Sequence, residues 1–204
     1  MRNWLAAWSV GAMVAGGGVA SAQVLTGTPP SLTVTVNVRV TDQAHVPPRE
    51  LADAEARATA AYRAAGFDLV WSPASQEPEA NKAAVDVRVV ILPRELTSRY
   101  CRAEGLNDRV MGFAVSAATN THGRIAYIFY DRIFQNATTN RTLVERGLGH
   151  VLAHEVGHLL LGFNKHSAQG LMQPNWNPGE SLVQTFTTSQ VQTIRRRFTA
   201  LTAN

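Results

Sequence analysis

Residues 154 to 166 read HEVGHLLLGFNKH, and this short segment says more about structure and chemistry than any other part of the 204-residue chain. Four residues of an α-helix turn through about 400°, so His154 and His158 lie one turn apart on one face and both imidazoles can reach a single ion. Glu155 is rotated by about 100° from His154, which places its carboxylate beside the ion. The segment therefore predicts a helix that carries a metal site, with Glu155 as the general base for a water molecule there.

A third ligand has to come from outside this helix, because catalytic zinc sites use three protein ligands and leave the fourth position to water. Gly162 ends the predicted helix and lets the chain turn back, which brings His166 within range of the same ion. Three neutral imidazoles leave the charge of Zn²⁺ uncompensated and so favour acidification of the bound water. The predicted Zn²⁺ ligands are therefore His154, His158 and His166.

The rest of the chain predicts an α+β fold, in which a twisted mixed sheet of about five strands packs with the metal-site helix and a C-terminal helix. Residues 32 to 40 alternate apolar and polar side chains, as a half-buried strand does. Two later β-rich runs, joined by the turn-forming segment 117–123, are expected to pair as an antiparallel hairpin. Thr142 and Glu145 match a capping box at the start of the metal-site helix. The predicted strands are 31–40, 67–71, 85–92, 110–115 and 125–130, and the predicted helices are 49–65, 142–161 and 188–201.

The first 22 residues have the order of a secretory signal peptide. Arg2 is followed by an apolar run and then by the small-residue triplet Ala20-Ser21-Ala22, which predicts cleavage before Gln23. The run is shorter than the roughly 20 residues of a membrane-spanning helix and contains four glycines, which disfavours a membrane anchor. We therefore expect residues 1–22 to be a signal peptide and residues 23–204 to be a single domain, secreted or periplasmic.

Charge and cysteine content exclude two further classes. The net charge is +4, but acidic and basic residues alternate along the chain and the basic run 195–197 falls on a predicted helix, where such runs are usually solvated. No aromatic side chains are interleaved with it, so we do not expect binding to nucleic acid. Cys101 is the sole cysteine and excludes an intramolecular disulfide framework. A buried or idle thiol is expected there, and a thiol that caps the zinc is the alternative.

The segment 154–166 resembles the metzincin clan of zinc peptidases, whose pattern is HExxHxxGxxH followed by a methionine turn. Here the pattern is lengthened to HExxHxxxGxxxH. The clan's order of strand, helix, four strands and helix, with an antiparallel strand before the last one and a further helix after the turn, matches the order predicted for about residues 31 to 201. The resemblance implies that Met172 lies beneath the metal and that residues 110–115 pair with an extended substrate.

The resemblance also implies the function of an exported zinc metalloendopeptidase, in which a zinc-bound water activated by Glu155 hydrolyses a peptide or protein substrate. Glu180 is the rival of His166 as third ligand, in the manner of the gluzincins, where a glutamate on a later helix completes the site. Two other functions stay open: a non-catalytic exported zinc-binding protein with a zincin shell, and a zinc amidase acting on the cell wall. Product analysis on peptide and peptidoglycan substrates would distinguish the peptidase from the amidase.

Three further side chains are candidates for secondary roles. His150 lies one helical turn before His154, too far from the ion to be a fourth ligand, and is expected at the surface or behind the ligands. Tyr127 and Tyr130 could stabilise an oxyanion, although strand alternation would turn one of them away from the site.

Overall fold

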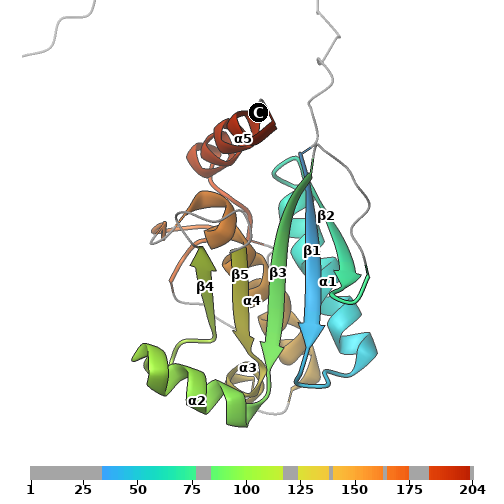
Figure 1. Ribbon diagram of the computed structural model, residues 1–204, viewed down its shortest axis with the longest axis vertical. Coiled ribbons are helices and arrows are strands. Elements are labelled where there is room, and N and C mark those ends of the chain that lie inside the picture. Colours follow the sequence, from blue (N-terminus) through green and yellow to red (C-terminus); the bar gives the residue numbers. More distant parts are fainter. Residues whose placement is uncertain are drawn as a thin grey trace, which may run out of the picture. The chain divides into compact units, whose positions relative to one another are not determined.

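Five strands form one mixed sheet in the order β2-β1-β3-β5-β4 (Figure 1). The strands are β1 (Val34–Asp42), β2 (Phe67–Pro73), β3 (Ala84–Leu92), β4 (Gly112–Ser116) and β5 (Arg124–Phe129). The first three and β5 run parallel, and β4 pairs with β5 in the antiparallel direction. The predicted antiparallel pairing is thus confirmed, and β4 lies at one edge of the sheet, opposite the edge formed by β2.

This computed structural model describes most of the chain, and the predicted signal peptide and the alternative ligand Glu180 lie outside its described residues. The described ranges are 34–76, 84–116, 124–137, 140–162, 165–174 and 184–202. No helix in these ranges is long and apolar enough to cross a membrane.

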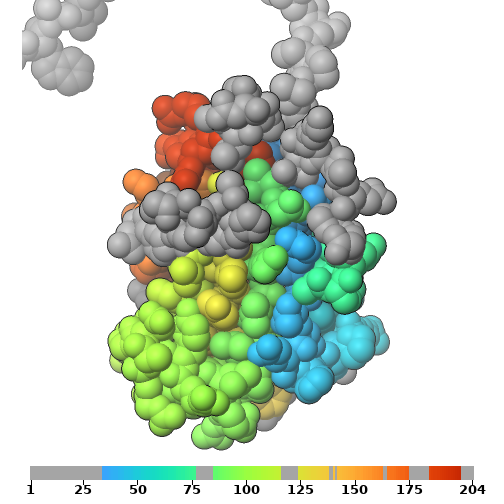
Figure 2. Space-filling model, in the orientation of Figure 1, coloured from blue at the N-terminus to red at the C-terminus, as the bar shows by residue number. Residues whose placement is uncertain are grey.

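The alternation in β1 decides which face of the sheet is covered. Val36, Val38 and Val40 are buried, whereas the residues between them are partly exposed. Side chains of a strand point alternately to the two faces, so the valines form one apolar face of the sheet. Helices α1 (Pro48–Arg63) and α4 (Arg141–Leu161) lie behind the sheet in Figure 1 and cover that face. Figure 2 shows β1 (blue) and β3 (green) exposing side chains on the other face.

Helix α4 contacts α1, two other helices and three strands of the sheet, and its residues from 147 to 161 are buried except for His150 and His158. Gly149 lets it approach α1 closely, because a Cβ atom there would lie 2.9 Å from the carbonyl oxygen of Ala54. The hydroxyl of Tyr62 donates a hydrogen bond of 3.0 Å to the carbonyl oxygen of Ala153. These contacts fix the helix that carries the candidate metal-binding residues against α1, and the same helix also contacts β4 and β5.

The predicted capping box is wrong, although the predicted helix is confirmed to within one residue. The N-cap of α4 is Asn140, whose side chain accepts a hydrogen bond from the backbone N–H of Leu143. Asparagine is among the best N-cap residues, and it stands two positions before Thr142, so the helix starts earlier than the capping box with Glu145 requires.

The structure contains two helices that the sequence did not predict, one among the four successive strands and one after the last of them. Helix α2 (Arg94–Glu104) separates β3 from β4, and α3 (Tyr130–Asn136) separates β5 from α4. Tyr130 begins α3 and does not end β5, which corrects the strand predicted to include it. The C-terminal helix α5 (Thr188–Thr202) forms as predicted, so the described residues contain five helices and an α+β fold.

Cys101 is a buried thiol on α2 and is 5% exposed. It packs in a small apolar cluster with Leu92 and Phe129, apart from the main core between the sheet and α4. It does not line the cleft described below. The location confirms the expectation of a buried thiol.

Candidate metal centre and cleft

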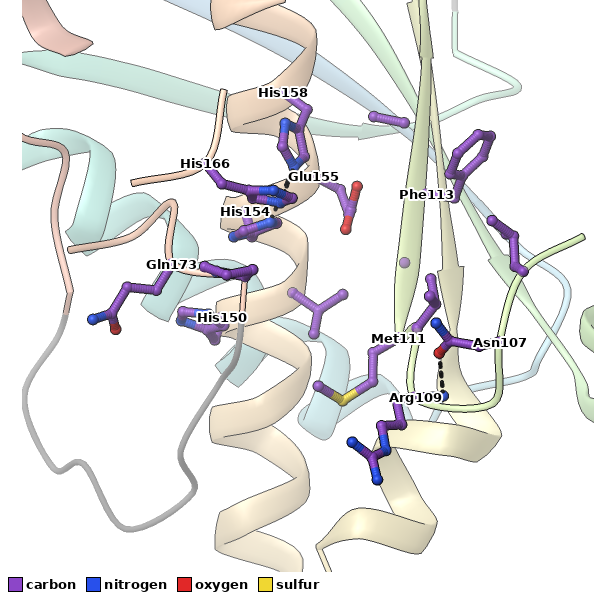
Figure 3. Close-up of a pocket in the computed structure, with 16 residues that line it drawn as sticks. Asn107, Arg109, Met111, Phe113, His150, His154, Glu155, His158, His166 and Gln173 are labelled. Atoms are coloured by element: carbon purple, nitrogen blue, oxygen red, sulfur yellow. Dashed lines mark hydrogen bonds between the residues drawn. The ribbon is translucent and has the colours of Figure 1, made fainter. Parts of the chain in front are cut away.

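Three imidazoles converge at one point beside α4 (Figure 3). His154 and His158 come from adjacent turns of the helix, and His166 comes from the segment beyond its end. The Nε2 atom of His158 lies 3.1 Å from Nε2 of His154 and 3.2 Å from Nε2 of His166. One ligand atom from each ring lies within 4.8 Å of the others. The three histidines are therefore close enough to bind a single metal ion.

Two of the three spacings, and the tautomer of His154, are compatible with a tetrahedral ion such as zinc. Zn–N bonds of about 2.0–2.1 Å place two tetrahedral ligand atoms roughly 3.3–3.4 Å apart, near the two short distances in this centre. The Nδ1 of His154 lies 2.9 Å from the carbonyl oxygen of Leu171, which can only accept a hydrogen bond. The proton of His154 is therefore on Nδ1, and its Nε2 keeps the lone pair that a metal needs.

Burial keeps the two helical ligands neutral. It lowers the pKa of His154, and it lowers the pKa of His158 to about 3, with further lowering from the neighbouring imidazoles. Metal ions bind the neutral imidazole, so at neutral pH no proton has to leave these rings before an ion enters.

A hydrogen-bonded turn presents His166 to the two helical ligands. Gly162 ends α4 with a φ of 97°, a left-handed value that suits glycine. The backbone N–H of Ser167 donates to the carbonyl oxygen of Met172 at 2.9 Å. The Ser167 hydroxyl oxygen accepts a hydrogen bond of 3.1 Å from Nε2 of Gln190, a largely buried side chain on α5. Helix α5 thus supports the turn that carries His166.

Met172 is fully buried beneath the ligand helix. A Cβ atom on Gly157 would lie 2.6 Å from the sulfur of Met172, so the thioether packs on the turn of α4 between His154 and His158. The preceding residue, Leu171, accepts the hydrogen bond from His154 described above. The segment around Met172 therefore both packs under the ligand helix and orients one of its ligands.

The side chain of Glu155 projects from α4 and lies against β4. This side chain is 6% exposed, and a Cβ atom on Gly112 of β4 would meet its Cγ at 2.6 Å and its Oε1 at 2.7 Å. Burial raises the pKa of Glu155 to about 8. This carboxyl group therefore lines the same cleft as the three imidazoles and is held against β4.

The centre opens into a cleft of about 370 Å³, a size typical of ligand sites. One wall is α4 with the turn around His166, and the other is β4 with the loop that precedes it. His150 also lines this cleft, with its ring centroid 6.0 Å from that of His154, and burial lowers its pKa to about 4. It stands outside the group of three ligands, as expected from the helix geometry.

The two tyrosines considered for oxyanion stabilisation do not line the cleft. The hydroxyl of Tyr130 donates to Oε1 of Glu50 at 2.7 Å, and the ring of Tyr127 packs 4.4 Å from that of Tyr100. The sequence analysis missed Gly112, although a glycine inside a β-rich run is a known sign of close approach by another group.

The comparisons with known proteins neither support nor contradict a family assignment. No model of a known protein family matches the chain, and none of the curated proteins matches it. The candidate metal centre therefore rests on the geometry of its own residues.

Proposed function

We propose that the protein is a secreted or periplasmic zinc-dependent endopeptidase of the metzincin type. The observation that carries the proposal is the convergence of three imidazole Nε2 atoms in a cleft where the buried Glu155 touches an edge strand. The α+β fold, the antiparallel edge strand and Met172 beneath the ligand helix are the features that the metzincin resemblance leads us to expect.

In this proposal His154, His158 and His166 hold Zn²⁺. When bound, the ion supplies a Lewis acid that polarises a substrate carbonyl and lowers the pKa of water. Three ligands from the chain leave one tetrahedral position open, as in catalytic zinc sites. The hydrogen bond from His154 to Leu171 holds the first imidazole in the tautomer that this requires.

Glu155 moves the proton. Burial alone raises its pKa to about 8, but the positive charge of a cation held by the adjacent imidazoles favours the ionised carboxylate. The carboxylate takes a proton from the attacking water as the water oxygen bonds to the carbonyl carbon. Glu155 then gives this proton to the amide nitrogen as the C–N bond breaks, and returns to its ionised form.

Strand β4 provides a surface for the peptide. It is one of the two edge strands of the sheet, and it lines the cleft. An edge strand has unpaired backbone N–H and C=O groups on one side, to which an extended peptide can add as a further strand. A peptide bound in this way passes beside Gly112, where the carboxylate of Glu155 lies.

Substitution of Glu155 tests the proposal most directly. Glu155→Gln is expected to bind one zinc ion per chain, as the wild type does, and to lose about 100- to 10,000-fold in peptide hydrolysis, because the general base is gone. Glu95→Gln, which changes an exposed glutamate on α2, is the matched control and should keep full turnover. Cleavage at the wild-type rate by Glu155→Gln would contradict the mechanism.

The ligand set is tested by metal analysis. His166→Ala should reduce zinc content after dialysis, whereas Glu180→Ala should retain it, and the reverse result would make Glu180 the third ligand. His45→Asn is the matched control, because His45 is exposed, has a φ of 54° that asparagine tolerates, and lies outside the cluster of three histidines. Peptidoglycan fragments assayed beside peptides separate an amidase, and a zinc-loaded protein that cleaves neither is non-catalytic.

A further inference from the structure

Arg109 brings a positive charge to one end of the cleft (Figure 3). Its side chain is exposed, and no hydrogen bond or ion pair reaches its guanidinium from any residue that the structure describes. Among the described residues that line the cleft, Glu155 is the sole carboxylate, and it is buried against Gly112. The charge of Arg109 is therefore not used within the described part of the protein.

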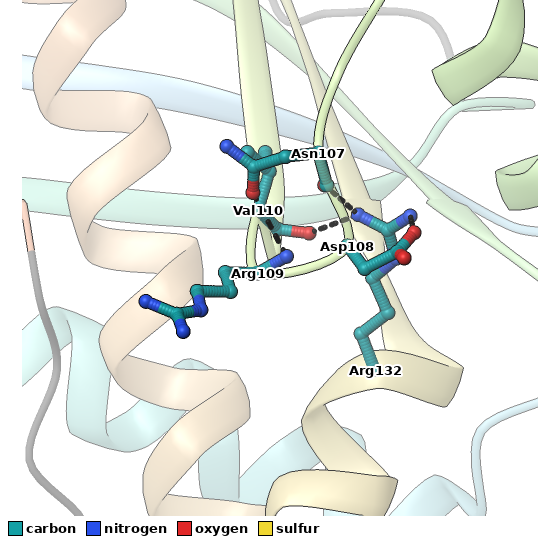
Figure 4. A network of polar contacts seen from close by, with 5 residues as sticks. All are labelled: Asn107, Asp108, Arg109, Val110 and Arg132. Atoms are coloured by element: carbon teal, nitrogen blue, oxygen red, sulfur yellow. Dashed lines mark hydrogen bonds and ion pairs between the residues drawn. The ribbon is translucent and has the colours of Figure 1, made fainter.

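The loop that carries Arg109 is held in place by another arginine (Figure 4). Nη1 of Arg132 donates hydrogen bonds to the carbonyl oxygens of Asn107 at 2.8 Å and Val110 at 2.7 Å. Nη2 lies 3.4 Å from a carboxylate oxygen of Asp108, and the side chain of Arg132 is only 11% exposed. One largely buried guanidinium thus binds the loop on both sides of Arg109.

A second contact fixes the backbone of Arg109 itself. Its N–H donates to Oδ1 of Asn107 at 2.9 Å, which closes a local turn within the anchored loop. Arg132 and Asn107 therefore hold the loop in its conformation, and the guanidinium of Arg109 contributes no bond to this among the described residues. A cation without a structural role on an anchored loop in a cleft is suited to bind a ligand, because little ordering of the loop is needed on binding.

The direction of β4 decides which part of a bound peptide meets this cation. The strand starts at Gly112, next to Glu155, and runs away from the loop that holds Arg109. Antiparallel pairing is more stable per residue than parallel pairing, so an added peptide should run opposite to β4. Its residues on the C-terminal side of the cleaved bond then lie at the Arg109 end of the cleft.

We propose that Arg109 binds a substrate carboxylate on the C-terminal side of the cleaved bond. The ligand is either an acidic side chain or the free C-terminal carboxylate of a short peptide, since a guanidinium forms paired hydrogen bonds with both. This inference rests on the proposed peptidase function and adds a substrate class to it: peptides that are acidic after the cut.

Binding to zinc-loaded Glu155→Gln, which should not cut its ligands, tests the inference. Three labelled, N-acetylated peptides are compared by fluorescence anisotropy: one with an internal Asp and an amidated C-terminus, one with Asn in its place, and the Asn peptide with a free C-terminus. We expect at least one acidic peptide to bind about 5- to 20-fold tighter than the neutral one. The two acidic peptides distinguish side-chain from C-terminal recognition.

Adding Arg109→Gln should reduce the ratio of acidic to neutral affinity to below about 2, and Arg109→Lys should give an intermediate ratio, because lysine keeps the charge but loses the paired hydrogen bonds. Arg102→Gln, an exposed arginine on α2 outside the cleft, is the matched control and should leave the ratio unchanged. An acidic preference that is absent in the parent, or that survives Arg109→Gln, overturns the inference.

Assays of wild-type hydrolysis on the same three peptides separate this inference from the proposed function. If the peptides are cut with no preference that depends on Arg109, the carboxylate site is wrong and the peptidase stands. If no peptide is cut but the affinity ratio depends on Arg109, the result counts against the peptidase, and Arg109 is a carboxylate-binding residue of a protein that binds peptides without cutting them.

Discussion

The contact between Gly112 and Glu155 can be tested without any assumption about substrate. A methyl group at position 112 would lie 2.6 Å from Cγ and 2.8 Å from Cδ of Glu155, about 0.8 Å inside the 3.4 Å at which ordinary contact begins. These atoms belong to the Glu155 side chain, which is 6% exposed on α4, so it has to move within a buried site to make room for the methyl group. Gly112→Ala should therefore lower the free energy of unfolding by about 1–3 kcal/mol, as overpacking does.

A double-mutant cycle isolates this contact. Urea unfolding of the zinc-free protein is measured for the wild type, Gly112→Ala, Glu155→Ala and the double variant, so that changes in metal affinity do not enter. Glu155→Ala removes the atoms that the new methyl group would meet, and Gly112→Ala should then cost little. The expected coupling free energy is about 1–3 kcal/mol.

Gly149→Ala provides the matched control for this cycle. A Cβ atom there would lie 2.9 Å from the carbonyl oxygen of Ala54, and its contact with α1 does not involve Glu155. It should destabilise the protein equally with and without the glutamate. If Gly112→Ala is also additive with Glu155→Ala, within about 0.5 kcal/mol, then Glu155 does not pack against β4. Catalysis by Glu155 at the peptide-binding edge would then lose its structural basis.

Three further outcomes are expected. Zinc at about 1,000 times its dissociation constant should raise the free energy of unfolding by about 4 kcal/mol in calorimetry, and His166→Ala, but not His45→Asn, should abolish most of that gain. In the zinc-free protein, Glu155→Gln should raise the free energy of unfolding by about 4 kcal/mol at pH 8 and hardly at pH 4. Burial raises the pKa of Glu155 from a usual 4.5 to about 8 in the folded protein. The wild-type protein therefore loses stability as the pH rises from about 4.5 to 8, and the glutamine variant does not. Gln190→Ala removes the hydrogen bond to Ser167 and should weaken zinc affinity about 3- to 10-fold, measured by competition with a chelator, without altering zinc stoichiometry.

The elements that the sequence predicted well are those whose burial is periodic. Alternation in β1 and the helical stripe of α1 each reflect one buried face, and local sequence alone records that face. The spacing of His154 and His158 is equally local, because one turn of α4 brings the two rings together. The α+β class and the antiparallel pairing of β4 with β5 followed from such local patterns.

Helices α2 and α3 were missed for different reasons. Helix α2 has two sequence signals, since Pro93 precedes it and Gly105 ends it with a φ of 65°, but it is short and lies between β-rich runs. Helix α3 has only seven residues and follows β5 directly, so it leaves little periodicity to detect. Here the apolar run of the strand passes into the helix without a turn residue, and Tyr130 was assigned to the wrong element.

Contacts across the cleft could not be predicted, because they depend on which strand lies at the edge of the sheet. The order β2-β1-β3-β5-β4 brings Gly112 to Glu155, 43 positions later in the numbering, and no local pattern records that meeting. The same holds for Arg132, whose side chain anchors a loop more than 20 residues earlier. Arginine and glycine are common in loops and strands, so the roles of Gly112 and Arg132 can be recognised only once the fold is known.

The segment between His158 and His166 is two residues longer than in the HExxHxxGxxH pattern, so ordering this segment is a larger part of the free-energy cost of forming the metal centre. Two ligands are ordered by α4 whether or not a metal is bound, whereas His166 is exposed and comes from a turn beyond the helix. Ordering each residue of such a turn costs about 1–2 kcal/mol. The bonds from Ser167 to Met172 and from Gln190 to Ser167 offset part of that cost before the ion arrives. The C-terminal helix α5 thus contributes to metal affinity without supplying a ligand, which is why its removal should weaken zinc binding even if the sheet and α4 stay folded.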